Sequence, residues 1–340
     1  MPAADELRGS PMLRHPEFQA EVERWIAFWT EGRGGRWFPE YLARMGAFEG
    51  TVDEALEETG LPAMLRYLPV VESGYSLRAV SSASAVGLWQ FMAPTARGYG
   101  MEVSALRDER RNPFKATTAA TRFLGSLRDR FGSWHLALAA YNSGPGRVQG
   151  VIRRHAPLRP RSDSLYWELR PHLPRETRDF VPKLYAAAWI AENPERYGIP
   201  EPAPLPPFAF DEVTVPDATT LDVVARAAGV DQEAVEHLNP ELVRGITPPG
   251  QETVLRVPPG SADRFQEEYA LIPPSERVSF VEHRVQPGET LGHIAIRYGV
   301  PVREVREANP DLRPRYLQIG QRIIVPIAPL GGRTEANRAG

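Results

Sequence analysis

The chain has 340 residues, more than one ordinary hydrophobic core requires, and this length indicates about two or three domains. Its 40 basic and 43 acidic residues give a net charge of -3, without the one-signed field that gathers phosphate backbones, so no nucleic-acid partner is expected. The chain has no cysteine, which excludes disulfides and thiolate metal sites and leaves the redox compartment open.

The first residues do not have the composition of a secretory signal. Residues 1–14 include Asp5 and Glu6 and lack an apolar stretch, and no later apolar run approaches about 20 residues. The sequence therefore predicts no membrane-spanning segment. We recognise neither an export signal nor the cysteine that a lipid anchor would require.

Residues 11–197 are predicted to be largely helical. A cluster of aromatic and apolar residues around Trp25 marks an early helix, and two further periodic segments follow at 116–131 and 134–141. The segment 134–141 is apolar nearly all round, which is typical of a buried helix, and Gly144 past its end is suited to a C-cap. We expect a central core helix there.

A proline-rich segment divides the chain. Residues 199–210 lose every periodic signal and alternate proline with other residues, so a stiff, extended linker is predicted. We divide the region before it into an N-terminal helical extension over 1–60 and a helical domain over 61–198. Beyond it the chain is expected to fold separately.

The C-terminal part repeats itself. Nine residues recur at an offset of 70 positions, which indicates two copies of one module, at 211–260 and 280–328. The second copy has apolar residues at helical spacing between short β-rich runs, the pattern of a strand, helix, helix, strand unit. A second linker is predicted over 261–279 and a disordered tail over 329–340. The nine residues of the first copy are Leu221, Ala225, Gly229, Val230, Asn239, Pro240, Leu242, Gly250 and Gln251.

One carboxylate stands out in the helical region. Within residues 61–74, apolar side chains line one helical face, and Glu72 ends that run immediately before Ser73 and Gly74. Taken alone, a glutamate at such a place is more often a solvated helix end or a salt-bridge partner than a catalytic group. Its neighbours change that interpretation.

Four sequence segments, one containing Glu72 and three following it, have the composition of short motifs. They read VESGYSLRAVS at 71–81, GLWQFMAPTA at 87–96, AAYNSGPGRV at 139–148 and LPRETRDFVPK at 173–183. Together they resemble the lytic transglycosylases of glycoside hydrolase family 23, most closely the membrane-bound lytic transglycosylase D branch. The resemblance implies a mainly α fold, in which a lysozyme-like, all-helical catalytic domain is followed by two small βααβ modules.

The resemblance also implies roles for individual residues. Glu72 corresponds to the sole catalytic acid of the family, and seven other positions shape or line the glycan groove. Without the resemblance, each of the seven has a plainer interpretation as a helix cap, a core filler or an ion-pair partner. The seven are Ser73, Ser81, Gln90, Met92, Tyr141, Asn142 and Glu176.

The implied chemistry is consistent with the residues. Glycosidic cleavage needs an acid that is protonated near neutral pH, and the apolar residues Leu68, Val71 and Trp89 are candidates to raise the pKa of Glu72. The sequence near Glu72 offers no obvious second carboxylate, as ordinary glycosidases require. By resemblance, the substrate's N-acetyl group and its muramic acid 6-hydroxyl complete the reaction, giving a 1,6-anhydro product without cofactor or metal.

Alternatives remain open at this stage. A hydrolytic muramidase would let water attack, and a non-catalytic scaffold would only hold peptidoglycan glycan strands. Activity on chitin is disfavoured, because cyclisation needs the muramic acid 6-hydroxyl. The expected partners are peptidoglycan strands, the expected location is the periplasmic cell envelope, and the chain is expected to be a monomer.

Two positions depart from the family pattern. Ser84 stands where many relatives have glycine, and serine is strained there if that position needs a positive φ. Phe180 replaces a tyrosine of the Glu-Thr-Arg-x-Tyr-Val motif and removes one hydroxyl from the groove. Neither change touches Glu72, so both bear on sugar binding more than on the chemistry.

The second repeat resembles a LysM module. The segments HRVQPGETL at 283–291, ANPDL at 308–312 and IGQRIIVP at 319–326 carry the resemblance, which implies binding to glycans that contain N-acetylglucosamine. The first repeat has PDATTL at 216–221, with one extra residue and no glycine, so it is predicted to be degenerate and its glycan binding stays open. The residues expected to bind glycan in the second module are Gly288, Thr290, Leu291, Asn309, Pro310 and Ile319.

Overall fold

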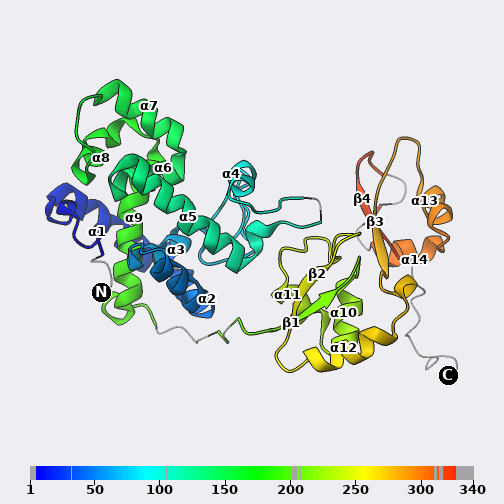
Figure 1. The fold of residues 1–340 in the computed structure, drawn as a ribbon. Helices are drawn as coiled ribbons and strands as arrows, with labels where there is room; N and C mark the ends of the chain where they lie inside the picture. Colours follow the sequence, from blue (N-terminus) through cyan, green and yellow to red (C-terminus); the bar gives the residue numbers. More distant parts are fainter. Residues whose placement is uncertain are drawn as a thin grey trace. The chain divides into compact units, whose positions relative to one another are not determined.

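The computed structural model describes residues 5–31, 33–104, 106–200, 205–206, 208–309, 312–313 and 317–326. The chain divides into two compact units, one made of residues 1–103 and 108–208 and the other of residues 104–107 and 209–340 (Figure 1). The predicted fold class is confirmed, because the described residues are mainly helical and form two small two-stranded sheets. The tail predicted to be disordered lies outside the described residues.

The described residues of the first unit form helices and a few isolated antiparallel β-bridges, such as Val86 with Phe91. Short 3-10 turns connect the helices at Pro11–Arg14, Arg33–Arg36, Ala63–Tyr67, Glu109–Arg111, Arg170–His172 and Pro194–Tyr197. The α-helices are α1 (Pro16–Thr30), α2 (Phe38–Glu58), α3 (Leu68–Ser73), α4 (Ala93–Gly98), α5 (Pro113–Phe131), α6 (Trp134–Ser143), α7 (Pro145–His155), α8 (Asp163–Leu169) and α9 (Arg175–Glu192).

Helix α6 is the central helix of this unit. It contacts α5, α7, α8 and α9, and every residue from Trp134 to Ala140 is buried. The helix begins where Ser133 Oγ accepts a hydrogen bond from the Leu136 amide, and it ends at Gly144, the C-cap that the sequence predicted. The apolar composition of the segment therefore has the predicted consequence, a helix surrounded by other helices.

The N-terminal helices share the hydrophobic core of the rest of the unit. Phe18 of α1 stacks on His135 of α6 and meets Tyr185 of α9 edge-on, with ring centroids 5.6 Å and 5.3 Å apart. The Tyr185 hydroxyl donates a 2.7 Å hydrogen bond to the Leu7 carbonyl, and α2 packs on α5. The residues before position 60 are therefore not packed as a separate extension.

The second unit contains two modules of similar build. The first has β1 (Asp211–Val215), α10 (Leu221–Ala228), α11 (Gln232–Leu238) and β2 (Thr253–Val257). The second has β3 (Phe280–Arg284), α13 (Leu291–Tyr298), α14 (Val302–Glu307) and β4 (Arg322–Pro326). In each module the two strands pair antiparallel, so the predicted strand, helix, helix, strand order is confirmed.

The segment after β2 contains a helix that the sequence analysis took for linker. Helix α12 (Ala262–Leu271) buries Phe265 and Tyr269 in the core of the first module and packs on α10. The Asp211 carboxylate of β1 accepts a 2.7 Å hydrogen bond from the Gly260 amide just before the helix begins. The first module therefore includes residues beyond position 260, and a 3-10 turn at Pro274–Glu276 follows it.

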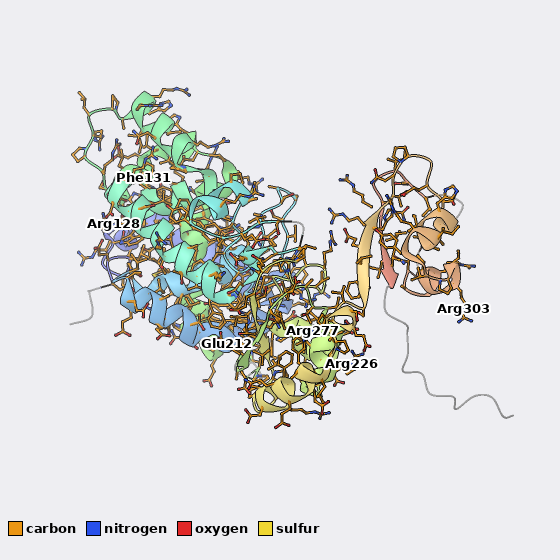
Figure 2. All side chains as sticks on the ribbon, turned by 45° about the vertical axis from the view of Figure 1, so that its right-hand side comes forward. Arg128, Phe131, Glu212, Arg226, Arg277 and Arg303 are labelled. Atoms are coloured by element: carbon orange, nitrogen blue, oxygen red, sulfur yellow. The ribbon has the colours of Figure 1, made fainter. Side chains whose placement is uncertain are left out.

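Charged side chains are exposed on both modules of the second unit. Arg226 of α10 and Arg303 of α14 are exposed, whereas Phe131 at the end of α5 is fully buried (Figure 2). In the described part of the chain, no helix combines the length and apolar composition that crossing a bilayer would require.

Candidate active site

Glu72 lies in the last turn of the short helix α3, and the end of that helix is held firmly. Gly74 ends it in the left-handed conformation, with φ 57°, and its amide hydrogen-bonds back to the Val70 carbonyl. Tyr41 of α2 packs against Gly74 so closely that a Cβ there would lie 2.4 Å from the ring. Arg44 donates a 2.8 Å hydrogen bond to the Gly74 carbonyl. Helix α2 thereby fixes the direction in which Glu72 points.

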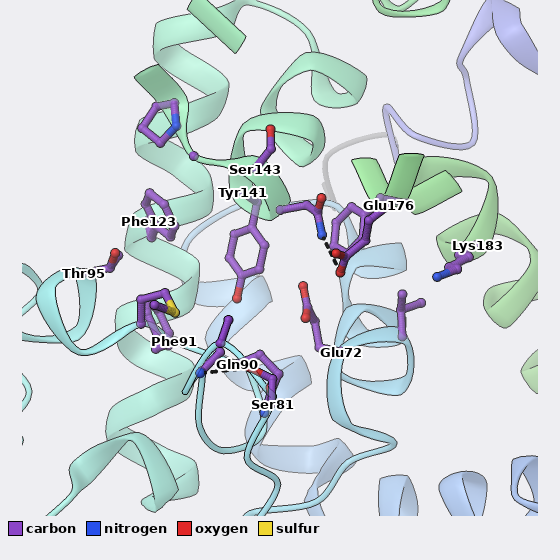
Figure 3. Close-up of a pocket in the computed structure, with 18 residues that line it drawn as sticks. Glu72, Ser81, Gln90, Phe91, Thr95, Phe123, Tyr141, Ser143, Glu176 and Lys183 are labelled. Carbon is purple, nitrogen blue, oxygen red and sulfur yellow. Dashed lines mark hydrogen bonds between the residues drawn. The ribbon is translucent and has the colours of Figure 1, made fainter. Parts of the chain in front are cut away.

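Glu72 opens into a cavity of about 440 Å³. Residues from α3, the loop 81–92, α5, α6 and α9 form its walls, and Glu72 and Tyr141 point into it from opposite sides (Figure 3). Of the eight residues that the sequence assigns to the catalytic domain's site, seven line this cavity. They are Glu72, Ser81, Gln90, Met92, Tyr141, Asn142 and Glu176.

Ser73 is the eighth of these residues and does not line this cavity. Its Oγ donates a 2.8 Å hydrogen bond to the Leu88 carbonyl and accepts one of 3.2 Å from the Ser76 amide. Ser73 therefore joins the end of α3 to the loop that carries Gln90. Its hydroxyl serves the geometry of the site.

The surroundings of Glu72 favour its protonated form. Burial raises the pKa of the Glu72 carboxyl to about 8, the negative charge of Glu176 adds to the rise, and the positive charge of Lys183 opposes it. Of the predicted apolar residues, Val71 lines the cavity, whereas Leu68 and Trp89 are buried in the core. An acid with this pKa is protonated at neutral pH yet still able to ionise.

A second carboxylate reaches the same cavity. Glu176 lies at the start of α9, far from Glu72 in the sequence, and its side chain is exposed to the cavity. Asn142 Nδ2 donates a 3.4 Å hydrogen bond to Glu176 Oε1, and Thr177 Oγ1 donates one of 2.7 Å to Asn142 Oδ1. The sequence near Glu72 gave no second carboxylate because the fold brings this one from another helix.

The loop 81–92 is held in a strained conformation. Gln90 and Ser84 both have positive φ, 50° and 64°, so the strain expected at Ser84 is present. Arg110 Nη1 donates 3.1 Å hydrogen bonds to the carbonyls of Ser84 and Phe91, while the rest of its guanidinium pairs with Asp108. Because Arg110 and Asp108 are both buried, removing one of the two would leave the charge of the other uncompensated in the interior.

Tyr141 contributes the opposite wall. Its hydroxyl donates a 2.7 Å hydrogen bond to the Trp89 carbonyl, and burial raises its pKa well above the ordinary value. Phe180, the departure from the family motif, stacks nearly parallel to the Tyr141 ring at 6.5 Å and lines the cavity. Tyr141 therefore offers a neutral hydroxyl at neutral pH, and Phe180 adds an apolar surface in place of the missing hydroxyl.

Sequence reasoning missed several cavity residues. Lys183 ends the segment LPRETRDFVPK at 173–183. A cationic side chain in a segment expected to line the groove was a signal that could have found it. Phe123 belongs to the periodic apolar pattern of α5, which does not distinguish a cavity residue from a core residue. The other residues that line the cavity are Ala83, Ala85, Phe91, Thr95, Ser143, Gly144 and Pro145.

The second module gives its predicted binding residues different roles. Leu291 is only 4% exposed and belongs to the module core, and Asn309 donates both amide hydrogens, to the carbonyls of Val305 and Ile324. These contacts assign Leu291 and Asn309 to the fold, in place of the predicted contact with glycan. A side-chain amide whose two hydrogens are already bonded within the protein has none left to donate to a ligand.

The remaining residues of that set stay candidates. Gly288 (φ 79°) and Thr290 are exposed in the loop before α13, where Thr290 Oγ1 also accepts a hydrogen bond from the His293 amide. Glu289 fixes this loop by accepting 2.7 Å hydrogen bonds from the Gln286 amide and His283 Nε2. Ile319 is 71% exposed, and Pro310 lies outside the described residues.

The corresponding loop of the first module is buried in its second half, at Thr219 and Thr220. Thr219 is fully buried, its amide donates a 2.8 Å hydrogen bond to Thr247 Oγ1, and its hydroxyl shares one of 2.7 Å with the hydroxyl of Tyr269 on α12. Helix α12 therefore covers the loop that stays exposed in the second module. The first copy, predicted to be degenerate, thus differs from the second in how far this loop is exposed.

Comparison with known families agrees with these observations. Residues 52–161 match the transglycosylase SLT domain, residues 209–274 match the LysM-like domain of lytic transglycosylase MltD, and residues 283–326 match the LysM domain. The first LysM-type match reaches beyond α12. The module boundary therefore follows the packing of that helix.

Individual relatives agree as well. The chain is 32% identical over 281 residues to membrane-bound lytic murein transglycosylase D of Escherichia coli (strain K12), covering 79% of this chain and 61% of that protein. It thus spans about three fifths of the relative's length.

Two solved structures match part of the chain. One is an inactive mutant of the lytic transglycosylase Slt from Pseudomonas aeruginosa, with 25% identity over 46% of this chain and 25% of that one, at a TM-score of 0.36. The other is the 70 kDa soluble lytic transglycosylase from Escherichia coli, with 23% identity over 43% of this chain and 24% of that one, at a TM-score of 0.37. Residues 52–161 are therefore a transglycosylase SLT domain, and two LysM-type modules follow it at 209–274 and 283–326.

Proposed function

We propose that this protein is a lytic transglycosylase that cleaves the β-1,4 bond between N-acetylmuramic acid and N-acetylglucosamine in peptidoglycan. The observation that carries the proposal is the Glu72 carboxyl, held at the wall of a cavity with its pKa raised to about 8. A general acid for glycosidic cleavage must hold its proton at working pH, and the raised pKa keeps Glu72 protonated near neutral pH. The curated relative is named for the same reaction class.

The proposed reaction uses Glu72 twice. Its carboxyl first gives a proton to the bridging oxygen, and the bond from that oxygen to C1 of the muramyl residue breaks. The N-acetyl oxygen of that residue stabilises the positive charge left at C1. The Glu72 carboxylate then takes the proton from the 6-hydroxyl while the oxygen of that hydroxyl attacks C1. This step forms the 1,6-anhydro ring and restores the acid without consuming water.

The neighbours of Glu72 suit both halves of this cycle. The charge of Glu176 favours the protonated acid needed for the first step, and the charge of Lys183 favours the carboxylate needed for the second. A pKa that lies near working pH balances the two requirements, because neither protonation state is then strongly preferred. The cavity walls therefore support a group that must both give and take a proton.

A hydrolytic muramidase is the alternative that a specific observation favours. Glu176 lines the same cavity as Glu72, and hydrolysing glycosidases work with two carboxylates. Digestion of purified sacculi followed by mass spectrometry of the soluble products separates the alternatives. Transglycosylation gives anhydro-muropeptides, hydrolysis gives products heavier by one water, and a non-catalytic scaffold releases nothing.

The pH dependence is expected to follow the charges around Glu72. Activity should fall as pH rises through about 8, because the acid then loses its proton. Glu176→Gln removes a negative charge and should move this fall to lower pH, whereas Lys183→Met should move it to higher pH. The measurement is kcat/KM on soluble glycan strands between pH 5 and 10.

The control is Glu168→Gln. Glu168 lies on α8, pairs with Arg159 and does not line the cavity, so its replacement should leave the profile in place. Shifts of the two cavity variants in the same direction would contradict this assignment of charges.

The second module is proposed to hold the enzyme on the wall polymer while the cavity works. A weak tethered binder raises the local concentration of an insoluble substrate. In a Glu72→Gln background, Ile319→Asp should weaken cosedimentation with purified sacculi by about fivefold or more, since it places a charge on an exposed apolar contact. Val254→Asp is the matched control, because Val254 is 54% exposed on the first module. Equal losses for the two variants would refute a binding role specific to the second module.

A further inference from the structure

A second cavity adjoins the first at Glu72. Its volume is about 460 Å³, and it shares five lining residues with the first cavity. The five are Val71, Glu72, Ser81, Gln90 and Lys183. The acid at which a glycosidic bond would be protonated is therefore a wall of both cavities.

Aromatic side chains from the N-terminal helices line the second cavity. Trp25, Phe28 and Trp29 come from α1 at a spacing that puts them on one helical face, and Tyr41 comes from α2. The rings of Trp25 and Phe28 meet edge-on, with centroids 5.2 Å apart. Phe28 is 45% exposed, so part of an aromatic ring faces the open cavity. All four residues lie before position 52, outside the part that matches the SLT family.

Lys183 joins this aromatic wall to the acid. Its Nζ lies 4.3 Å from the centroid of the Trp25 ring, and its charge acts on Glu72. The contact couples α1 to α9 at the junction of the two cavities. It also places a cation at the junction of the two cavities, because Lys183 lines both.

We propose that the second cavity binds the glycan strand on the other side of the bond that is cleaved, with the Phe28 and Trp25 rings as the stacking surface for a sugar. The proposal rests on the transglycosylase function proposed above. A polymer that is cut between two sugars extends from the acid in both directions. Only a site with room on both sides of Glu72 accommodates it. The amphipathic faces of sugar rings and the flat faces of aromatic rings bury each other's apolar surface.

This assignment gives the N-terminal helices a role in substrate binding. Helix α1 shares the core of the domain through Phe18 and carries the aromatic wall through Trp25 and Phe28. Phe18 lies near the start of α1 and the aromatic wall lies in its second half, so the same helix packs into the core at one end and lines the second cavity at the other. A strand that fills both cavities is held on both sides of Glu72, as cleavage within a strand requires.

The test uses the full chain and glycan strands freed of peptide. Phe28→Ala should raise KM for these strands by about three- to tenfold with kcat little changed, because Phe28 touches the sugar and not the reacting atoms. Phe28→Trp keeps an aromatic face and should stay near the wild-type KM. Trp37→Ala is the matched control, since Trp37 is 48% exposed in the same N-terminal region and lines neither cavity.

The outcomes separate the two proposals. A rise in KM confined to Phe28→Ala, with an unchanged Tm, supports the second cavity as a glycan site. Equal KM values for wild type and Phe28→Ala, or an equal rise in Trp37→Ala, overturn it while the wild-type chain still cleaves. Absence of cleavage by the wild-type chain overturns the proposed function itself, whatever the variants do.

Discussion

Replacement of Glu72 by glutamine is expected to abolish release of soluble fragments from sacculi, with a rate at least about a thousandfold lower than wild type. Glutamine has nearly the same shape but can neither give an acidic proton to the bridging oxygen nor take one from the 6-hydroxyl. General acid and base catalysis contributes roughly two to four powers of ten in one step, and Glu72 serves in two. Turbidity of a sacculus suspension and chromatography of released fragments measure the loss.

Binding and stability serve as the controls for this variant. Cosedimentation with sacculi should be retained, because the cavities and the LysM module are unchanged. The raised pKa means that the folded chain holds the Glu72 proton more tightly than the unfolded chain. The stability from this proton is full below about pH 4.5 and is lost as pH rises through about 8. Glu72→Gln should therefore raise Tm at pH 9 and change it little at pH 4.

Unchanged cleavage by Glu72→Gln would contradict the assignment of this residue as the acid. Loss of cleavage together with a lower Tm at every pH would mean that the substitution had damaged the fold. We expect a higher Tm at high pH instead, because the amide has the same shape as the acid and carries no charge that burial would penalise.

Gly87→Ala is expected to cause the largest loss of stability among single substitutions in the catalytic loop. Gly87 has φ 83°, and a Cβ there would lie 1.9 Å from the Arg110 carbonyl oxygen. Backbone would have to move, at a cost of about 3 kcal/mol or more when the left-handed conformation and the collision are combined. The loop carries Gln90 and Ser81, so activity on glycan strands should fall as well.

Gly100→Ala is the matched control for this substitution. Gly100 has φ 86°, nearly the same as Gly87, but no neighbouring atom lies within 4 Å of the position its Cβ would take. It should therefore cost only the backbone penalty of the left-handed conformation, about 1–2 kcal/mol. Thermal unfolding followed by circular dichroism compares the two. A fall in Tm for Gly87→Ala no larger than that for Gly100→Ala would show that the collision is relieved without cost.

Much of the candidate site could be predicted because its residues lie in short segments with strong local patterns. Glu72, Gln90, Tyr141 and Glu176 come from four different segments, and only the resemblance brought them together in advance. The buried helix α6 and the repeat at an offset of 70 residues followed from composition and periodicity alone. The positive φ at Ser84 was anticipated because glycine is usual at that place.

The remainder depended on tertiary contacts that no local pattern specifies. Helix α12 is short and mostly polar, and its Phe265 and Tyr269 are apolar neighbours four residues apart, too few to outweigh the prolines around them. The aromatic residues around Trp25 predicted a helix and nothing further, because a periodic pattern does not distinguish a cavity wall from a buried face. Leu291 and Asn309 were predicted to bind glycan because the LysM resemblance places the groove in their two loops. A place in such a loop does not tell a ligand-binding side chain from one that packs within the module.

Direct titration of the Glu72 carboxyl tests the central claim most closely. The carbon-13 NMR signal of its carboxyl carbon, assigned by its absence in Glu72→Gln, should move with an apparent pKa of about 8 in the wild-type chain. A midpoint near the ordinary value of 4.5 would mean that the acid is ionised at neutral pH and would contradict the account of how this chain cleaves glycan.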